Sequence, residues 1–281
     1  MTGRARRPAA VRARDARDAR DGRSRRWRFG PSPARAAALL AMIACLLGLY
    51  GLTTMPALTI TRIEVSPLTW TDRDELVRWL RLDPGINAFQ LPTDHLAERL
   101  EEIPTVADAR VEVRLPDTLA VTVTERQPIL AWRVGDVTFL VDREGMLFAL
   151  ASKVGGSGAG LPTILDGRGG STAILGIGTR IDPTDLDVAT RLASLKPDDV
   201  GSGADGLVVR ISDADGFVIT TTPASWTAVF GPYSPVLRSP ELVPGQVRLL
   251  RSMLFGKETR ILRVVLADET HGTVVPLASG R

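Results

Sequence analysis

Cysteine and histidine are scarce in this chain, which has 281 residues but only one cysteine and two histidines. The single cysteine, Cys45, lies inside a long apolar run, so no intramolecular disulfide can stabilise a folded domain. A thiol in that apolar surrounding also does not suit nucleophilic catalysis. Folding must therefore rest on packing, and a hydrophobic content of 44% in a chain of this length can supply a core.

The sequence has no cluster of residues with the spacing of a catalytic or metal-binding site. His95 and His271 lack the short spacings of a zinc site and the HExxH pattern. His95 has no Ser or Cys partner close in sequence, and His271 lies near the end of the sequence, so both are expected to face solvent. The acidic pairs at 101–102 and 198–199 are adjacent, so their carboxylates do not face a common point as a catalytic pair would. The sequence therefore predicts no enzyme, no metal and no cofactor.

Two short motifs resemble ligand-binding loops but stand in the wrong context. Residues 201–206 match GxGxxG, yet a dinucleotide fingerprint follows a strand and opens a helix, whereas this segment precedes the strand-like residues 207–210. Residues 213–216, Asp-Ala-Asp-Gly, lack the further ligands of a calcium loop. We interpret the first segment as a linker and the second as a hairpin turn.

One apolar run stands out, and no second stretch approaches it. Ala36 to Leu52 gives 17 residues without a charge, or 21 if the run continues to Pro56. Because roughly 20 apolar residues cross the hydrocarbon core of a bilayer, we predict a transmembrane helix over residues 36–56.

The charges on the two sides of this run have opposite signs. Residues 1–35 hold twelve arginines and three aspartates, a net charge of +9, whereas residues 36–281 hold 23 basic and 29 acidic side chains, a net charge of −6. Cationic segments beside a span stay in the cytoplasm. The sequence therefore predicts a disordered, Arg-rich cytoplasmic tail over 1–35, a single pass through the cell (inner) membrane, and extracytoplasmic domains beyond it.

The N-terminal region has two weaker interpretations, an export signal and a nucleic-acid-binding arm. Residues 24–29, Ser-Arg-Arg-Trp-Arg-Phe, are faintly similar to a twin-arginine export signal, but the apolar run exceeds the usual 7–15 residues of a signal and no A-x-A-like site follows it. An Arg-rich arm can also bind nucleic acid. Topology and anionic lipid already account for the arginines, so no nucleic-acid partner is expected.

The residues after the span predict the order strand, helix, helix, strand, strand. Apolar spacing and breakers give a strand within 58–65 that either contains a bulge or starts late near Arg62. They also give a helix over 72–81 with Thr71 as N-cap and a second helix from Pro92-Thr93 to Pro104. Ala107, Ala109, Val111, Val113 and Leu115 are expected on one face of the next strand. A turn at 116–118 leads to a return strand that carries Leu119, Val121 and Val123.

The remaining sequence is mainly β. The predicted strands are 129–134, 137–141, 146–150, 207–211, 217–221, 226–230 and a closing strand over 260–266, with helices starting at Asp182-Pro183 and carrying Val243 to Leu254, and a flexible loop at 153–160.

This arrangement resembles a POTRA domain, and more closely the bacterial cell-division family FtsQ, called DivIB in some bacteria. The residues that carry the resemblance are Leu82, Gly85, Asn87, Phe89, Ile103-Pro104, Val106, Ala109, Pro116 to Leu119, Glu125 to Pro128, Leu140 to Asp142, Gly145 and Phe148. Thr105 departs from the family, which often has Trp there. The resemblance implies an α+β protein with a POTRA-like β-α-α-β-β domain over 58–126 and an FtsQ-type β-rich domain with flanking helices over 127–281.

The resemblance also implies a function and partners. FtsQ-like proteins are noncatalytic scaffolds of the septal division machinery, the divisome, and the C-terminal edge of their β-rich domain receives the single-span coiled-coil proteins FtsB and FtsL. We expect the strand made by Arg260, Ile261, Leu262, Arg263, Val264, Val265 and Leu266 to be that accepting edge, with Val264 and Leu266 facing the core and Arg263 and Val265 more exposed. The family often reads Val-Asp-Leu-Arg where this chain has Val264 to Ala267, so polar contacts there are expected to differ.

A second function class stays open from the sequence. An exported POTRA-containing polypeptide-binding protein of another secretion or envelope-assembly system would share the first domain. Outer-membrane members of that class append many alternating strands of about ten residues, for which the residues after the first domain leave no room.

Overall fold

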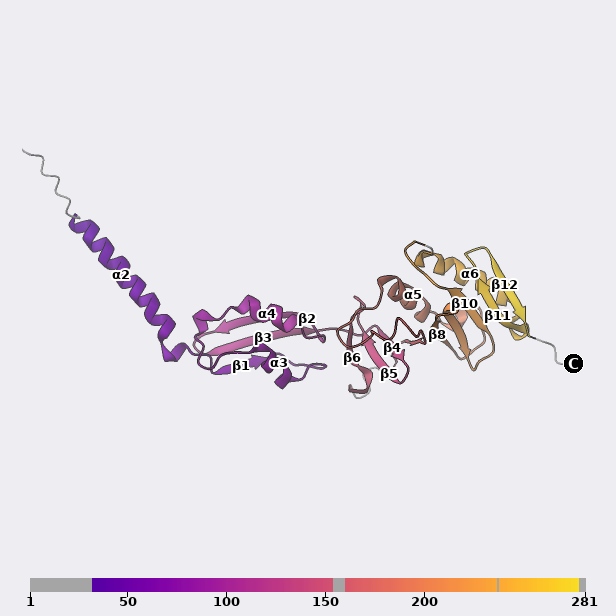
Figure 1. The fold of residues 1–281 in the computed structure, drawn as a ribbon, viewed down its shortest axis with the longest axis horizontal. Coiled ribbons are helices and arrows are strands. Elements are labelled where there is room, and N and C mark those ends of the chain that lie inside the picture. Colours follow the sequence, from indigo (N-terminus) through magenta and orange to yellow (C-terminus); the bar gives the residue numbers. More distant parts are fainter. Residues whose placement is uncertain (1–31, 154–159, 237, 278–281) are drawn as a thin grey trace, which may run out of the picture. The chain divides into compact units, whose positions relative to one another are not determined.

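The computed structural model describes residues 32–153, 160–236 and 238–277 (Figure 1). The predicted disordered tail and the predicted loop at 153–160 lie largely outside these residues. The chain divides into two units, one ending at Thr54 and one beginning at Met55, and each is described by itself.

The first unit contains the long helix α2, Pro33–Thr54. Its residues Pro33–Leu52 have a mean hydropathy of 1.9, and this is the one helix in the described part of the chain that is long and apolar enough to cross a membrane. The helix begins three residues before the predicted span because Ser32 accepts the Arg35 N–H and Pro33 fits the first helical position. It ends two residues before Pro56, which disfavours helical backbone in the residue that precedes it.

The POTRA-like part has the predicted order of elements. Its elements are β1 (Arg62–Val65), α3 (Arg73–Leu80), α4 (Thr93–Glu101), β2 (Val106–Arg114) and β3 (Thr118–Glu125). The sheet order is β1-β3-β2, with β1 parallel and β2 antiparallel to β3. Helices α3 and α4 bury their leucines against one face of this sheet, where Leu119 and Val121 meet them.

Two local predictions in this domain were wrong. The N-cap of α3 is Asp72, whose carboxylate accepts the N–H groups of Asp74 and Glu75, and not Thr71, whose hydroxyl pairs with that of Thr105. In β2, Ala107 is exposed and Val106 is buried, because the register shifts next to Val106 and changes which residues face the helices. Leu115 lies beyond the strand and is 59% exposed.

The β-rich part forms one nine-stranded sheet with two helices. Its strands are β4 (Leu130–Val134), β5 (Val137–Val141), β6 (Leu147–Leu150), β7 (Thr163–Asp166), β8 (Gly206–Ser212), β9 (Gly216–Thr222), β10 (Thr227–Gly231), β11 (Ile261–Leu266) and β12 (Gly272–Pro276), and its helices are α5 (Pro183–Ala193) and α6 (Val243–Leu254). The strand order is β12-β11-β10-β9-β8-β7-β4-β5-β6. The predicted α+β class with a β-rich C-terminal region is thus confirmed.

The larger hydrophobic core of this sheet lies on the face that α5 and α6 cover, and a smaller, separate cluster holds Leu140, Phe148 and Ala149 of β5 and β6. Helices α5 and α6 lie on the same side of the sheet (Figure 1). They belong to one core with Trp132, Ile164, Val209 and Ile211 from the middle strands and Val264 from β11. Strands β7 and β12 were not predicted. Strand β7 has four residues and runs parallel to both β4 and β8, so its neighbours come from distant parts of the sequence.

Glu125, the last residue of β3, and the next residue, Arg126, stabilise contacts between the POTRA-like part and the β-rich part. The carboxylate of Glu125 accepts the backbone N–H groups of Thr69, Trp70 and Thr71 at 2.6, 2.8 and 2.7 Å. The loop held in this way places the Trp70 ring 6.0 Å from that of Phe148, edge to face. Arg126 forms an ion pair with Asp142 in the turn between β5 and β6.

Candidate partner-binding edge

The residues predicted to form the accepting edge lie one strand inside it. Arg260 ends a 3-10 turn (Glu258–Arg260), and Ile261 to Leu266 form β11. Strand β11 is parallel to β10 on one side and antiparallel to β12 on the other. The prediction that 260–266 is the closing edge strand is therefore wrong, because the chain turns at 268–271 and adds β12 outside it. Whether these residues contact a partner stays a prediction.

The two faces of β11 are as predicted. Val264 and Leu266 are buried, whereas Val265 is 37% exposed and Arg263 is partly exposed, with Nη2 2.6 Å from the Asp215 carboxylate. Leu262 is 47% exposed, at the irregularity where the register with β12 shifts. Val265 and Arg263 thus present a mixed apolar and basic surface beside the edge.

Strand β12 is one of the two terminal strands of the nine-stranded sheet; the other, β6, exchanges backbone hydrogen bonds with residues 178–179 through Leu147. The Ala267 N–H donates to the His271 carbonyl at 2.9 Å, and the Leu277 N–H donates to the Arg260 carbonyl at 2.8 Å. Residues of an antiparallel pair alternate between facing the neighbouring strand and facing away from it. Counted from His271 at one end and from Leu277 at the other, this alternation turns the backbone groups of Thr273 and Val275 toward β11.

The same alternation turns Gly272, Val274 and Pro276 away from β11. They present two N–H groups and three carbonyl groups, since proline has no N–H. Val274 lies opposite the buried Val264 and is itself 38% exposed. A partner strand would therefore find backbone hydrogen-bonding groups together with a valine side chain.

The turn between β11 and β12 is fixed by Asp268. Its carboxylate accepts the backbone N–H groups of Thr270 and His271, both at 2.7 Å, and contacts the His271 ring nitrogen at 2.8 Å. These hydrogen bonds, led by the one from Thr270, hold the pKa of Asp268 well below its usual value. Gly245 in α6 leaves space for the side chain of Glu269, since a Cβ at position 245 would clash with Glu269 Cγ.

Buried polar groups tie the edge to the domain at the carboxyl ends of β10 and β11. Gln246 of α6 is fully buried, and its Nε2 donates to the carbonyls of Phe230 and Leu266 at 3.3 and 3.2 Å. Its Oε1 accepts the hydroxyl of Tyr233, whose pKa is raised because burial outweighs the nearby Arg238. Arg238 also donates to the carbonyls of Phe230 and Ala267.

The GxGxxG-like segment has an internal role. The Gly203 N–H and the Ser202 hydroxyl both donate to Glu258, which also accepts Trp226 Nε1 at 2.8 Å. Burial raises the pKa of the Glu258 carboxyl, but these three hydrogen bonds outweigh it, and the net pKa lies below the usual value. The predicted linker therefore anchors the turn that leads into β11.

The remaining candidates for chemistry lie on the surface. His95 contacts Glu98 at 3.2 Å, and both side chains are about three-quarters exposed. Within the described residues, no group of three or more His, Cys, Asp or Glu side chains could hold a metal ion. Asp213 and Asp215, in the predicted hairpin turn, pair with the Gly169 N–H and with Arg263.

The comparisons with known proteins agree with this architecture. Residues 58–126 match the family described as POTRA domain, FtsQ-type. The chain is 34% identical over 94 residues to the cell division protein FtsQ of Mycobacteroides abscessus, which covers 34% of this chain and 30% of that protein. It is 35% identical over 113 residues to FtsQ of Mycolicibacterium smegmatis, covering 40% and 34%. These matches support the predicted resemblance to the FtsQ/DivIB family.

The chain thus matches about a third of the length of these FtsQ relatives. A more distant FtsQ, from a Geobacter species, is 33% identical over 115 residues, 41% of each chain. Strand β12 is the one part of the candidate edge that was not predicted from the sequence. Its signal was the β-branched run Thr273-Val274-Val275, which follows a turn-forming Asp-Glu-Thr segment.

Proposed function

We propose that this chain is a noncatalytic, single-pass membrane scaffold of the bacterial divisome, which links septal division proteins through extracytoplasmic protein contacts. Its FtsQ-type POTRA domain, its relatives named cell division protein FtsQ and its apolar helix α2 support this proposal. The observation that carries it is the open strand β12, which ends a large sheet with unpaired backbone groups.

Strand addition is the contact that this edge suits. An extended segment can pair with the outward N–H and carbonyl groups of an edge strand, and side chains on either side then give selectivity. FtsB-like and FtsL-like single-span proteins are the partners we propose, and β12 replaces residues 260–266 as the accepting strand. From β11, the exposed Leu262 and Val265 would flank the added segment.

The charge asymmetry around α2 supports the orientation. Because residues 1–35 carry a net charge of +9, we propose a cytoplasmic N-terminus, extracytoplasmic folded domains and enrichment at the division septum. Compartment-sensitive reporters fused to either end test the topology, and an exported N-terminus would refute it. Imaging of a fluorescent fusion tests the location, with midcell enrichment and filamentous cells on depletion as the expected result.

The edge itself is tested with two proline variants of the full chain. Val274→Pro removes an outward N–H and leaves the bonds to β11, so it is expected to abolish capture of co-expressed FtsB-like and FtsL-like proteins without unfolding the domain. Thr273→Pro removes an inward N–H and is expected to loosen the β11–β12 hairpin as well.

Amide hydrogen exchange separates edge binding from general destabilisation. Without partner, the N–H groups of Gly272 and Val274 should exchange faster than those of Thr273 and Val275. Partner binding should protect the first pair. Unchanged capture by the Val274→Pro variant, or no added protection at Val274, would discard the edge model.

A further inference from the structure

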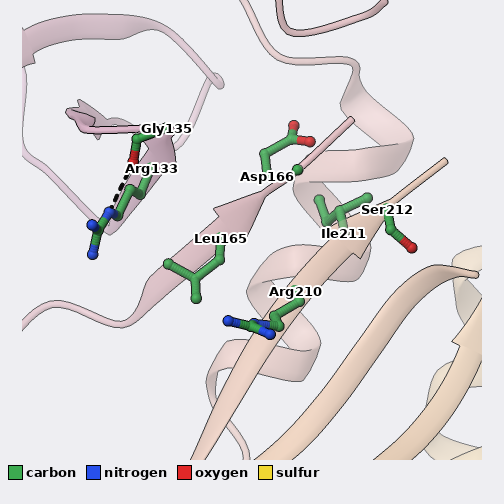
Figure 2. Close-up of a pocket in the computed structure, with 8 residues that line it drawn as sticks. Arg133, Gly135, Leu165, Asp166, Arg210, Ile211 and Ser212 are labelled. Carbon is green, nitrogen blue, oxygen red and sulfur yellow. Dashed lines mark hydrogen bonds between the residues drawn. The ribbon is translucent and has the colours of Figure 1, made fainter. Parts of the chain in front are cut away.

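The face of the nine-stranded sheet opposite α5 and α6 carries a hollow of about 420 Å³. It lies where the parallel strands β4, β7 and β8 end. Arg133, Leu165 and Arg210 line it, with Gly135, Gly167 and Ser212 at the strand ends. Figure 2 shows Leu165 between the two arginine side chains, with all three on the same side of the strands.

The order of these three side chains is set by strand register. Arg133 pairs with Leu165 across β4 and β7, and Leu165 pairs with Arg210 across β7 and β8. Strands lie about 4.8 Å apart, so the two arginine Cα atoms are roughly 9.6 Å apart with a leucine midway between them. The sheet thus presents two cations and one apolar side chain in a row.

Neither guanidinium is neutralised by the described residues. Arg133 uses only its Nε–H, which donates to the Gly135 carbonyl at 3.1 Å, and the Arg210 side chain has no hydrogen bond or ion pair with the described residues. Both side chains are exposed. Two guanidinium groups with most of their donors free attract anions and suit planar, bidentate acceptors.

The one acidic group that lines the hollow does not cancel this charge. The Asp166 side chain is fully buried and already accepts Arg168 Nη2 at 2.8 Å and Trp132 Nε1 at 3.1 Å. Arg168 also pairs with Asp185, so the Asp166 oxygens are engaged by Arg168 and Trp132 and not by Arg133 or Arg210. The Ser212 hydroxyl accepts the Asp215 N–H at 3.2 Å and keeps its own hydrogen for an outside acceptor. The hollow is thus a basic surface with an additional hydroxyl donor.

We propose that this hollow binds an acidic polypeptide segment in which two carboxylates flank an apolar residue. The apolar side chain rests on Leu165, and each carboxylate takes one guanidinium, Arg133 or Arg210. A helix with acidic residues seven positions apart fits the row, because seven residues rise about 10.5 Å. The site is separate from the β12 edge and does not depend on strand addition.

A phosphate group suits the hollow less well than a pair of carboxylates. In phosphate sites built from the protein backbone, several N–H groups usually point at one phosphate group. Here the Gly167 N–H already donates to the Ile211 carbonyl at 2.9 Å, and the Gly169 N–H donates to Asp213. The two guanidinium groups also lie on strands separated by β7, with an apolar side chain between them.

The test uses the full chain in nanodiscs of neutral lipid and a fluorescein-labelled, stapled helical peptide of about 18 residues. The peptide carries Glu at positions i and i+7 around a Leu at i+4, and its twin carries Gln at both positions. Fluorescence anisotropy measures binding. The Glu peptide is expected to bind more tightly than the Gln twin, and its affinity should fall with added salt.

Substitutions assign the contacts. Arg133→Gln and Arg210→Gln should each weaken binding of the Glu peptide roughly threefold, and the double variant roughly tenfold. Arg180→Gln, which removes one exposed charge elsewhere in the same domain, is the control and should leave binding unchanged. Val274→Pro should also leave it unchanged. The unfolding midpoint of each variant verifies that the fold is retained.

Two results would overturn the proposal. One is equal binding of the Glu and Gln peptides, or of the wild type and the double arginine variant. The other is selective binding of inorganic phosphate or of vesicles with anionic phosphatidylglycerol through Arg133 and Arg210 without binding of the Glu peptide. That second result would assign the hollow to phosphate groups.

Discussion

Arg126 Nη1 lies 2.6 Å from Asp142 Oδ2, and the two side chains are only 10% and 8% exposed. The same nitrogen lies 3.2 Å from Glu144, while Arg126 Nε is buried without a hydrogen-bond partner. Burial lowers the pKa of Arg126, but the bonds to Asp142 and Glu144 outweigh it and the net pKa is raised. This pair belongs to the junction between the POTRA-like and β-rich parts.

Replacing Arg126 should destabilise the protein much more than replacing an exposed arginine. Arg126→Gln leaves the Asp142 carboxylate buried without its cation, and we expect a loss of about 3 kcal/mol in the free energy of unfolding. Arg110→Gln, whose side chain is 77% exposed near Asp108, should cost less than about 0.5 kcal/mol. Denaturant unfolding of the full chain in detergent measures both, and equal costs would contradict the prediction.

Glu125 should make the stability of this junction depend on pH. Burial raises the pKa of its carboxyl, but the hydrogen bonds from Thr69, Trp70 and Thr71 outweigh burial, and the net pKa lies below its usual 4.5. A carboxyl with a lowered pKa stabilises the fold fully above its unfolded pKa and loses that contribution as the pH falls through the folded pKa.

Glu125→Gln should therefore reduce the free energy of unfolding by about 1–2 kcal/mol at neutral pH, because an amide cannot accept all three N–H groups. The difference from wild type should shrink as the pH falls from about 4.5, the usual glutamate pKa in the unfolded chain, through the lower pKa of Glu125 in the folded protein. Glu112→Gln on the exposed face of β2 is the control. A difference that stays constant with pH would show that ionisation of Glu125 does not matter.

Two Arg–Asp interactions in the β-rich part should contribute very different amounts to the free energy of unfolding. Arg168 bridges Asp166 and Asp185. The Asp166 side chain is fully buried, and the Arg168 side chain is 19% exposed. Arg168→Gln should cost about 3–5 kcal/mol, since it leaves buried carboxylates unpaired. Arg191→Gln, which breaks a pair with Asp187 on the surface of α5, should cost under about 0.5 kcal/mol. Similar unfolding midpoints for both variants would contradict this reasoning.

Gln246 should control the stability of the β11–β12 hairpin. Gln246→Leu leaves the carbonyl of Leu266 and the hydroxyl of Tyr233 without their buried partner, and we expect a loss of about 2–3 kcal/mol. Tyr233→Phe removes one hydrogen bond and should cost about 1 kcal/mol. Hydrogen exchange should show faster opening of Thr273 and Val275 in Gln246→Leu. An unchanged rate there would mean that Gln246 does not hold the hairpin.

Local sequence signals were sufficient for most of the POTRA-like part. The alternation from Ala109 to Val113 and from Leu119 to Val123 predicted the hairpin, and proline positions predicted the limits of α4. The choice between Thr71 and Asp72 as N-cap could not be made locally, because it depends on Thr105 and Glu125, which reach the loop from distant positions. The register shift at Val106 likewise belongs to the pairing with β3.

In the β-rich part, strand neighbours were harder to predict than strands. Nothing in the segment 260–266 shows that a second short strand covers it, since pairing with β12 is decided after the turn at Asp268. Strand β7 is short, and its partners β4 and β8 are far from it in sequence. The row formed by Arg133, Leu165 and Arg210 depends on that register, so no local pattern could reveal it.

Pro276 limits the length of any strand that adds to this protein. With two outward N–H groups and three outward carbonyls, β12 can align only a short stretch of a second chain before its hydrogen-bonding positions end. Such a short ladder gives little support to stacking of identical molecules into fibres. A binding segment must gain the rest of its affinity from side chains, so discrimination among candidate ligands rests on their sequence more than on their extended backbone.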